Sequence, residues 1–318
     1  MKIIDILEQA TEPLISYEII PPYRGKSASY VYGIIDELIE FDPPFIDVTS
    51  HAAEPIYLKQ QDGSYTRKSK RKRPGTLGLC AAIKYRYNVE TVPHILCRGF
   101  SRQETEDALI ELNYLGIENV LAITGDAGPK VKSHDPQKLV NDYSRDLVQQ
   151  IKDMNQGMYE DEVVESSGSN FCIGVGAYPE KHPDSPSIEN DIRSLKSKVE
   201  SGANYIVTQM FFNNDDYFRF VELCRSNGIN VPIIPGIKLI TKAGQLKSLP
   251  KHFSVNIPDS LVKSFESTSN KADHLEIGLE FALKQSEVLL QANVPAIHFY
   301  VMQDVKHIKK IVSTLRKY

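Results

Sequence analysis

The feature that most constrains the fold is a regular alternation of short apolar segments with longer amphipathic ones. Eight segments are rich in β-branched and aromatic residues, and stretches with helical spacing of apolar residues lie between them. Their apolar residues run almost without interruption, which is typical of parallel strands buried on both faces. The expected strands are ISYEII (15–20), FIDVTS (45–50), VPHILC (92–97), NVLAIT (119–124), FCIGVGAY (171–178), YIVTQMFF (205–212), VPIIPGIKLI (231–240) and AIHFYVM (296–302).

Six intervening segments have the apolar spacing of amphipathic helices. Ser101, followed three residues later by Glu104, matches a capping box, and Gly116, Gly202 and Gly228 lie where helices should end. The expected helices cover residues 29–41, 101–116, 135–154, 187–203, 214–228 and 273–292.

This alternation predicts an α/β fold, a single (β/α)8 TIM-type barrel with parallel strands that spans residues 1–318 as one domain. With 318 residues, of which 41% are hydrophobic, the chain can bury a core of this size. The main alternative is an open doubly wound sheet. However, no GxGxxG motif follows an early strand, which disfavours a dinucleotide-binding fold of that kind.

Composition excludes several functional classes. A net charge of −4 with 25% charged residues gives no general case for nucleic-acid or membrane binding. The N-terminus lacks the features of a secretory signal, and no stretch approaches the roughly 18 apolar residues of a membrane span. The four cysteines have neither zinc-like nor disulfide-like spacing, so we expect buried thiols, no metal and a cytoplasmic protein. A reactive thiol is possible at Cys97, which is near His94, but a free cysteine more often behaves as a small core residue.

In this class of barrel, active sites form where strands end and run into the following loops. Glu18 is the leading candidate there, because an ionised carboxylate is costly to bury in so apolar a strand. It therefore either faces a solvated cavity or has a raised pKa, and a protonated carboxyl can act as a general acid. A structural salt bridge is the alternative. Other polar residues near strand ends are Thr49, His51, His94, Asp126, Tyr178, His182 and Gln209.

Three of these candidates have structural alternatives. Asp126 could cap a turn, and His94 could be a core histidine, since nothing near it has metal-ligand spacing. Gln209 either finds partners in the barrel interior or pairs with a heterocycle at its mouth. On that strand, we expect Met210, Phe211 and Phe212 to divide between the interior and the helix-facing side.

Six motifs, in order along nearly the whole chain, resemble those of the methylenetetrahydrofolate reductase family of flavin-dependent barrel enzymes. The strongest is SYEIIPP, which is similar to the family's Ser-Phe-Glu-Phe-Phe-Pro-Pro. Several collinear motifs are far more specific than any one of them. The six are SYEIIPP (16–22), TGDAGP (124–129), AYPEKHP (177–183), VTQMFF (207–212), VPIIPGI (231–237) and HFY (298–300).

The resemblance implies reduction of 5,10-methylenetetrahydrofolate to 5-methyltetrahydrofolate by NADH or NADPH, in a ping-pong reaction through bound FAD, in a homo-oligomer. It implies that Glu18 is the general acid, that Asp126 lies near the pterin and the flavin, and that Gln209 and Tyr300 bind the folate. Asp191 and Lys198 are seven residues apart and would share one helix face. The implied FAD contacts are Thr49, His94, Gly125, Asp126, Tyr143, Tyr178, His182, Asp191 and Lys198.

The chain departs from the family pattern at Thr124, at Ser50 with His51, and at Ala243. It also departs at Asp304, the position at which the family's arginine is expected to meet the folate glutamate tail. Two functional alternatives therefore remain: another flavin-dependent barrel oxidoreductase, or a degraded relative that acts as a binding or regulatory module.

A basic insert at about residues 60–75 is predicted to be a solvated, mobile loop. Alternatively, it attracts polyglutamate tails or nucleotide phosphates. Its basic residues are Arg67, Lys68, Lys70, Arg71, Lys72 and Arg73.

Overall fold

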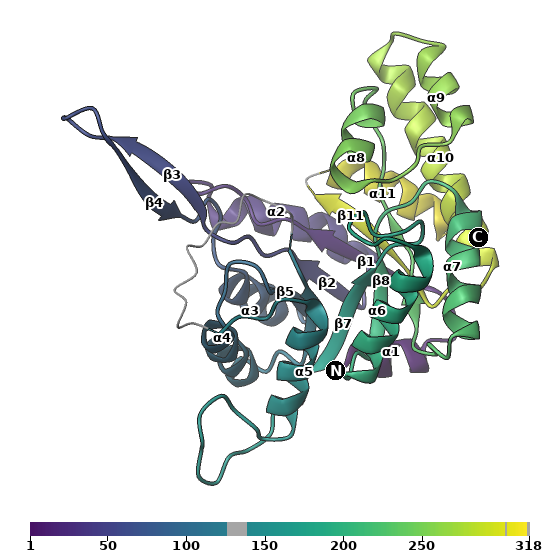
Figure 1. Ribbon diagram of the computed structural model, residues 1–318. Coiled ribbons are helices and arrows are strands. Elements are labelled where there is room, and N and C mark those ends of the chain that lie inside the picture. The colour runs from purple at the N-terminus through teal and green to yellow at the C-terminus, as the bar shows by residue number, and fades with distance from the viewer. Residues whose placement is uncertain (126–138, 303, 317–318) are drawn as a thin grey trace.

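The computed structural model describes residues 1–125, 139–302 and 304–316, and within these ranges nine parallel strands form one curved sheet (Figure 1). The strand order is β10-β11-β1-β2-β5-β6-β7-β8-β9. The strands are β1 (Leu14–Ile19), β2 (Phe45–Val48), β5 (Glu90–Leu96), β6 (Asn119–Ile123), β7 (Cys172–Ala177), β8 (Tyr205–Thr208), β9 (Ile233–Ile234), β10 (Gly236–Ile237) and β11 (Ala296–Met302).

The two ends of the sheet are halves of one expected strand, residues 231–240. Pro235 separates β9 from β10, because proline has no N–H to contribute to a ladder. β9 pairs with β8 and β10 pairs with β11, so the ring closes through Pro235. The prediction of an eight-position α/β barrel of the TIM type is therefore confirmed, with its seventh strand in two short pieces.

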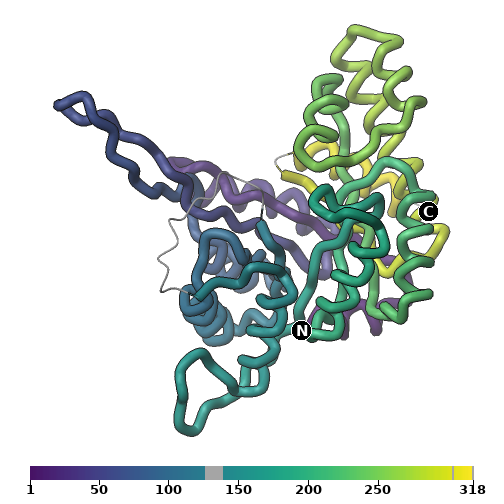
Figure 2. Tube along the Cα trace, in the orientation of Figure 1, coloured from purple at the N-terminus to yellow at the C-terminus, as the bar shows by residue number. Residues whose placement is uncertain are grey.

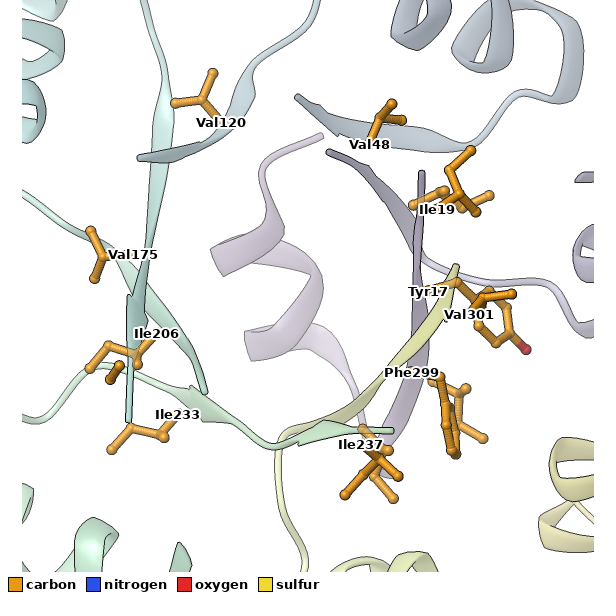
Figure 3. Packing of buried hydrophobic residues seen from close by; sticks show 14 of the residues in the cluster. Tyr17, Ile19, Val48, Val120, Val175, Ile206, Ile233, Ile237, Phe299 and Val301 are labelled. Carbon is orange, nitrogen blue, oxygen red and sulfur yellow. The ribbon is translucent and has the colours of Figure 1, made fainter. Parts of the chain in front are cut away.

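Helices surround the ring, and the strands turn large apolar side chains toward them. Figure 3 shows Tyr17, Val175, Ile237 and Phe299 on the outer side of the ring, and all four are buried. The sequence pattern does not predict α1, α3, α8, α9 and α11. The helices are α1 (Ile3–Gln9), α2 (Ala28–Leu38), the 3-10 helix η1 (Ile39–Phe41), α3 (Thr76–Tyr87), α4 (Arg102–Tyr114), α5 (Ser144–Asn155), α6 (Ile188–Glu200), α7 (Asn214–Ser226), α8 (Gln245–Phe253), α9 (Asp259–Glu266), α10 (Lys271–Gln291) and α11 (Val305–Leu315).

The end of the barrel where the strands begin is filled with apolar side chains. Ile3 and Leu7 of α1 pack in one cluster with inward-facing strand residues such as Phe45 and Tyr205. Gly174 makes room for the Tyr205 ring, since a Cβ at Gly174 would lie 2.4 Å from its Cζ atom. Because this end is closed, chemistry in the barrel is confined to the opposite end.

The basic insert is a β-hairpin rather than the expected loop, and it begins earlier in the chain. Strands β3 (Glu54–Lys59) and β4 (Tyr65–Lys70) pair antiparallel and project away from the barrel (Figures 1 and 2). The turn is closed by the N–H of Gln60, which donates to the Ser64 carbonyl oxygen at 2.8 Å. Gly63, with φ of +83°, supplies the left-handed residue of this turn.

The segment after β8 does not continue as a strand. β8 ends at Thr208, so the expected alternation of Met210, Phe211 and Phe212 between interior and exterior is wrong. Met210 and Phe212 pack in a cluster with residues of α8, α9 and α10, and the Phe211 ring stacks on Tyr217 with centroids 5.4 Å apart. This cluster holds the turn that follows β8 against the outer helices.

The four cysteines are free and buried, as the sequence predicts. Burial raises the pKa of the Cys97 thiol to about 12, which argues against a reactive thiolate at that position. Over the described part of the chain, no helix combines the length and apolar character needed to cross a membrane.

Candidate active site

The interior of the barrel becomes polar toward the carboxyl ends of its strands. Successive side chains of a strand alternate between the two faces of the sheet. Because Tyr17 and Phe299 face outward, Glu18 on β1 and His298 on β11 face inward. The same alternation on β2 directs Asp47 into the barrel. This arrangement collects ionisable groups at the end of the barrel that α1 leaves open.

Glu18, Asp47 and His94 form the centre of this polar region. Glu18 and Asp47 are register partners on neighbouring strands. The Nε2 atom of His94, on β5, lies 3.6 Å from Glu18 Oε2 and 3.5 Å from Asp47 Oδ2. Glu18 is 9% exposed whereas Asp47 is 0% exposed. The histidine therefore lies between two carboxyl groups, and Glu18 is the one closer to solvent.

The electrostatics of this region favour neutral forms. Burial raises the pKa of Asp47 to about 7, although His298 opposes the shift. Burial lowers the pKa of His298, and the Asp47 carboxylate opposes that shift. Ser16 Oγ and His298 Nδ1 form a hydrogen bond of 2.8 Å, which fixes the imidazole ring. The site can thus hold protons at near-neutral pH.

Tyr300, near the carboxyl end of β11, and Gln209, directly after β8, are brought close to each other through Thr208. The Tyr300 hydroxyl donates a hydrogen bond to the Thr208 carbonyl oxygen. The Gln209 side chain is oriented by the backbone of the next residue, because its Oε1 accepts from the N–H of Met210 at 2.9 Å. Gln209 follows β8 directly rather than lying within the strand.

A second group of predicted residues gathers around α6 and the loop after β7. The rings of Tyr178 and His182 meet edge to face with centroids 4.6 Å apart. The backbone N–H of His182 donates to Asp191 Oδ2 at 2.7 Å. Lys198 Nζ donates to the Gly176 carbonyl oxygen at 3.0 Å, and burial lowers the pKa of Lys198. The structure therefore brings Tyr178, His182, Asp191 and Lys198 together at one side of the barrel.

The other residues predicted to bind the cofactor lie outside the group around α6. Thr49 follows β2, and its buried Oγ1 has no hydrogen-bond partner among the described residues. Gly125 follows β6 with φ of +88°, a conformation that favours glycine. Tyr143 precedes α5 and is 63% exposed, so the protein itself leaves most of its ring uncovered. Asp126 lies outside the described residues.

Four polar residues of the site are missed by the sequence reasoning: Ser16, Asp47, Lys238 and His298. Lys238 Nζ donates to the Tyr300 carbonyl oxygen at 2.9 Å, and burial lowers its pKa while Asp304 and Glu18 oppose the shift. For three of these four residues, the sequence contained a pattern that could have identified them. Ser16, Asp47 and His298 each stand two residues before a candidate, so alternation puts them on the same inward face.

The basic hairpin is anchored beside this end of the barrel. The Arg73 guanidinium lies over the Tyr23 ring at 4.1 Å and donates a hydrogen bond to the Pro21 carbonyl oxygen. Arg71 lies over the Phe100 ring at 6.0 Å. The base of the hairpin is therefore held by the loops that follow β1 and β5, whereas its tip extends away (Figure 2).

Sequence comparison relates the chain as a whole to known enzymes. Residues 2–316 match the family described as methylenetetrahydrofolate reductase. The chain is 30% identical over 302 residues to the 5,10-methylenetetrahydrofolate reductase of Salmonella typhimurium, covering 95% of this chain and 90% of that protein. It is 28% identical to methylenetetrahydrofolate reductase (NADH) 1 of Arabidopsis thaliana, covering 95% of this chain and 48% of that protein.

Structural comparison supports the barrel fold. A Clostridium thermocellum protein, described as binding two copies of 5-methyl-5,6,7,8-tetrahydrofolic acid, superposes with a TM-score of 0.58 over 98% of both chains. Its sequence identity to this chain is 12%, so the likeness concerns the fold.

Proposed function

Because the chain belongs to the methylenetetrahydrofolate reductase family, we propose that it reduces 5,10-methylenetetrahydrofolate to 5-methyltetrahydrofolate with NADH or NADPH through bound FAD. The observation that carries this proposal is the position of Glu18. Its carboxyl lies at the open end of the barrel, 3.6 Å from His94 Nε2 and within reach of solvent. A carboxyl placed in this way can give a proton to a bound substrate.

Glu18 would open the five-membered ring of the folate. Its proton passes to the departing ring nitrogen, and the resulting iminium accepts hydride. Bound FAD would supply the redox chemistry, taking hydride from the nicotinamide and passing it to the folate in turn. The protein would contribute the position of the substrate and the supply of the proton.

The residues around α6 suit the polar parts of FAD. Lys198 can meet a phosphate oxygen, and Asp191 can accept from a ribose hydroxyl. The buried Thr49 Oγ1, which has no hydrogen-bond partner within residues 1–125, 139–302 and 304–316, provides a further polar contact. Tyr178, His182, Gly125 and His94 would complete the binding surface, with Tyr143 as an outer contact. The proposed role of Asp126 concerns a residue outside the described ranges.

Gln209 and Tyr300 would bind the pterin. An amide both donates and accepts hydrogen bonds, which matches the paired donors and acceptors of a pterin ring. The amide stands directly after β8, and its Oε1 is held at 2.9 Å by the Met210 N–H. Tyr300 is the register partner of Glu18, which places a substrate held by Tyr300 beside the proposed acid.

We also propose that the hairpin attracts anionic groups of the substrates, either the folate polyglutamate tail or the nucleotide phosphates. Asp304, which pairs with His307, cannot bind a tail carboxylate as an arginine would. Replacing both Arg67 and Lys68 by Gln should raise the KM for polyglutamylated folate more than for monoglutamylated folate. A rise in the NAD(P)H KM alone would identify the phosphates instead. The matched control replaces the exposed Lys263 and Lys271 by Gln.

The experiment that tests the proposed acid is Glu18→Gln, measured separately in the two half-reactions. We expect flavin reduction by NAD(P)H to stay within about twofold and reoxidation by methylenetetrahydrofolate to slow by about 10²–10⁴-fold, the usual contribution of a general acid. Reoxidation at the parent rate would refute the assignment. A purified protein without flavin absorbance would indicate a binding module. Flavin that NAD(P)H bleaches but folate leaves reduced would indicate another oxidoreductase.

The homo-oligomer implied by the family resemblance remains a proposal. Analytical ultracentrifugation of the purified protein at micromolar concentration would determine it, and a single monomeric species would refute it.

A further inference from the structure

Asp47 is a buried carboxyl with no role in the proposed reduction as described above. It is 0% exposed, and neither of its carboxylate oxygens has a hydrogen-bond partner among the described residues. A buried carboxylate without hydrogen bonds is strongly disfavoured, and a neighbouring carboxyl, Glu18, adds to the cost of its ionisation. Asp47 therefore favours a proton, and its position needs an explanation other than packing.

The ionisable groups that face Asp47 come from five elements around it. Only the two histidines among them can balance a negative charge. The imidazole of His298 is fixed by Ser16, and burial lowers its pKa, so His298 favours the neutral form. His94 is thus the group best placed to exchange a proton with Asp47. Among the described residues, these groups are Glu18 on β1, His94 on β5, Tyr205 on β8, His298 and Tyr300 on β11, and Cys80 on α3.

We propose that Asp47 is a positioning residue for the reduction, one that holds a proton in reserve and returns it through His94 to Glu18. This inference rests on the proposed function. Three observations carry it: Glu18 and Asp47 are register partners, His94 Nε2 lies 3.6 and 3.5 Å from their carboxylate oxygens, and Asp47 is sealed from solvent. A substrate can reach Glu18 but not Asp47, so Asp47 can act only through another group.

The proton transfers balance without any added reactant. Glu18 becomes a carboxylate when it gives its proton to the leaving nitrogen of the folate. Neutral His94 takes the proton of Asp47 on Nε2, so the Asp47 O–H bond breaks and an N–H bond forms. The imidazolium then gives that proton to Glu18, and the negative charge ends on Asp47. Water refills the reserve by way of Glu18, which is the more exposed carboxyl.

The two distances from His94 Nε2 to the carboxylate oxygens are longer than a usual hydrogen bond, as is common before a substrate tightens an active site. Because one nitrogen serves both carboxyls, a small rotation of the imidazole suffices for the exchange. Burial, which raises the pKa of Asp47 to about 7, supports this role, since protonated and ionised forms are then both accessible near neutral pH.

The first test is the pH profile of flavin reoxidation by methylenetetrahydrofolate in Asp47→Asn. Reoxidation needs protonated Glu18, so its rate falls as pH rises. In the relay the negative charge ends on Asp47, where it opposes ionisation of Glu18. Asp47→Asn cannot carry that charge, so we expect the falling limb to move to lower pH by about one unit or more. The rate of flavin reduction by NAD(P)H should stay within about twofold. Asp47→Glu, which keeps a titratable group, should restore much of the parent profile.

A purely structural role predicts a different result. Asp47→Asn would then slow both half-reactions at every pH, or weaken flavin binding, without moving the profile. Either that outcome or a profile identical to the parent's would overturn the inference. The control is Asp107→Asn on the exposed face of α4, which should leave both rates unchanged.

A second measurement needs neither turnover nor a folded variant. Infrared titration of the parent protein should show a carboxylic-acid carbonyl band that persists to near-neutral pH, where exposed carboxyls are ionised. Loss of every such band below about pH 5 would overturn the inference even if the enzyme is active. If the band is present but methylenetetrahydrofolate fails to oxidise the flavin, the proposed function fails while the buried proton stands.

Discussion

The buried carboxyl of Asp47 should give the protein a measurable loss of stability as pH rises. Its pKa is raised from 3.8 to about 7 in the folded protein, with desolvation as the largest cause. A group with a raised folded pKa contributes stability that is complete below its unfolded pKa of 3.8 and is lost as pH rises toward about 7. Asp47→Asn removes this titration while nearly keeping the shape of the side chain.

The size of the effect follows from the two pKa values. At one pKa unit per 1.36 kcal/mol, ionising Asp47 costs the folded protein up to about 4 kcal/mol at high pH. Most of the change measurable under native conditions, about 2–3 kcal/mol, falls between about pH 5 and pH 8. Relative to the parent, Asp47→Asn should therefore become progressively more stable across that interval and gain nothing further above it.

Denaturant unfolding of the parent and Asp47→Asn at several pH values measures this difference, with Asp62→Asn as the exposed control. The control should follow the parent throughout, because the lowered pKa of Asp62 places its titration below the interval. A constant difference between Asp47→Asn and the parent from about pH 5 to pH 8 would refute the raised pKa and the buried proton that depends on it.

Three further predictions concern the site and its supports. Gln209→Leu should raise the KM for methylenetetrahydrofolate by up to about tenfold, which corresponds to the loss of one hydrogen bond, and should leave the rate of flavin reduction unchanged. An unchanged folate affinity would indicate that Gln209 has only a structural role. Neutralising Arg67 and Lys68 should also make the KM for polyglutamylated folate less sensitive to salt than the parent's, and equal salt dependence would count against electrostatic attraction. Gly278→Ala places a Cβ 1.7 Å from the Ile240 carbonyl oxygen and should lower the free energy of unfolding by about 1–3 kcal/mol, whereas Gly33→Ala, with nothing within 4 Å, should not destabilise.

The barrel could be predicted because its strands carry near-continuous apolar runs, and this pattern depends on burial rather than on precise contacts. Local interruptions were harder. The sequence does not show that the run at 231–240 divides at Pro235, because a proline is tolerated where a strand starts, ends or breaks. The hairpin was missed for a related reason: its basic residues are typical of a solvated loop, and the pairing of Glu54 with Lys70 arises only across two strands.

The site could be predicted where a polar residue interrupts an apolar strand, as with Glu18 and His94. Asp47 and His298 met the same condition, but each stands close to a residue already singled out. What the sequence cannot supply is register. The proximity of Glu18 to Asp47 depends on which residues of β1 and β2 pair, and only the folded sheet shows that they are partners.

The central claim is tested most directly by an anaerobic stopped-flow experiment on the purified protein. The bound flavin is first reduced with one equivalent of NADH or NADPH and then mixed with 5,10-methylenetetrahydrofolate. The account predicts complete reoxidation with formation of one 5-methyltetrahydrofolate for each reduced flavin. Flavin that stays reduced, or reoxidation without that product, would contradict it.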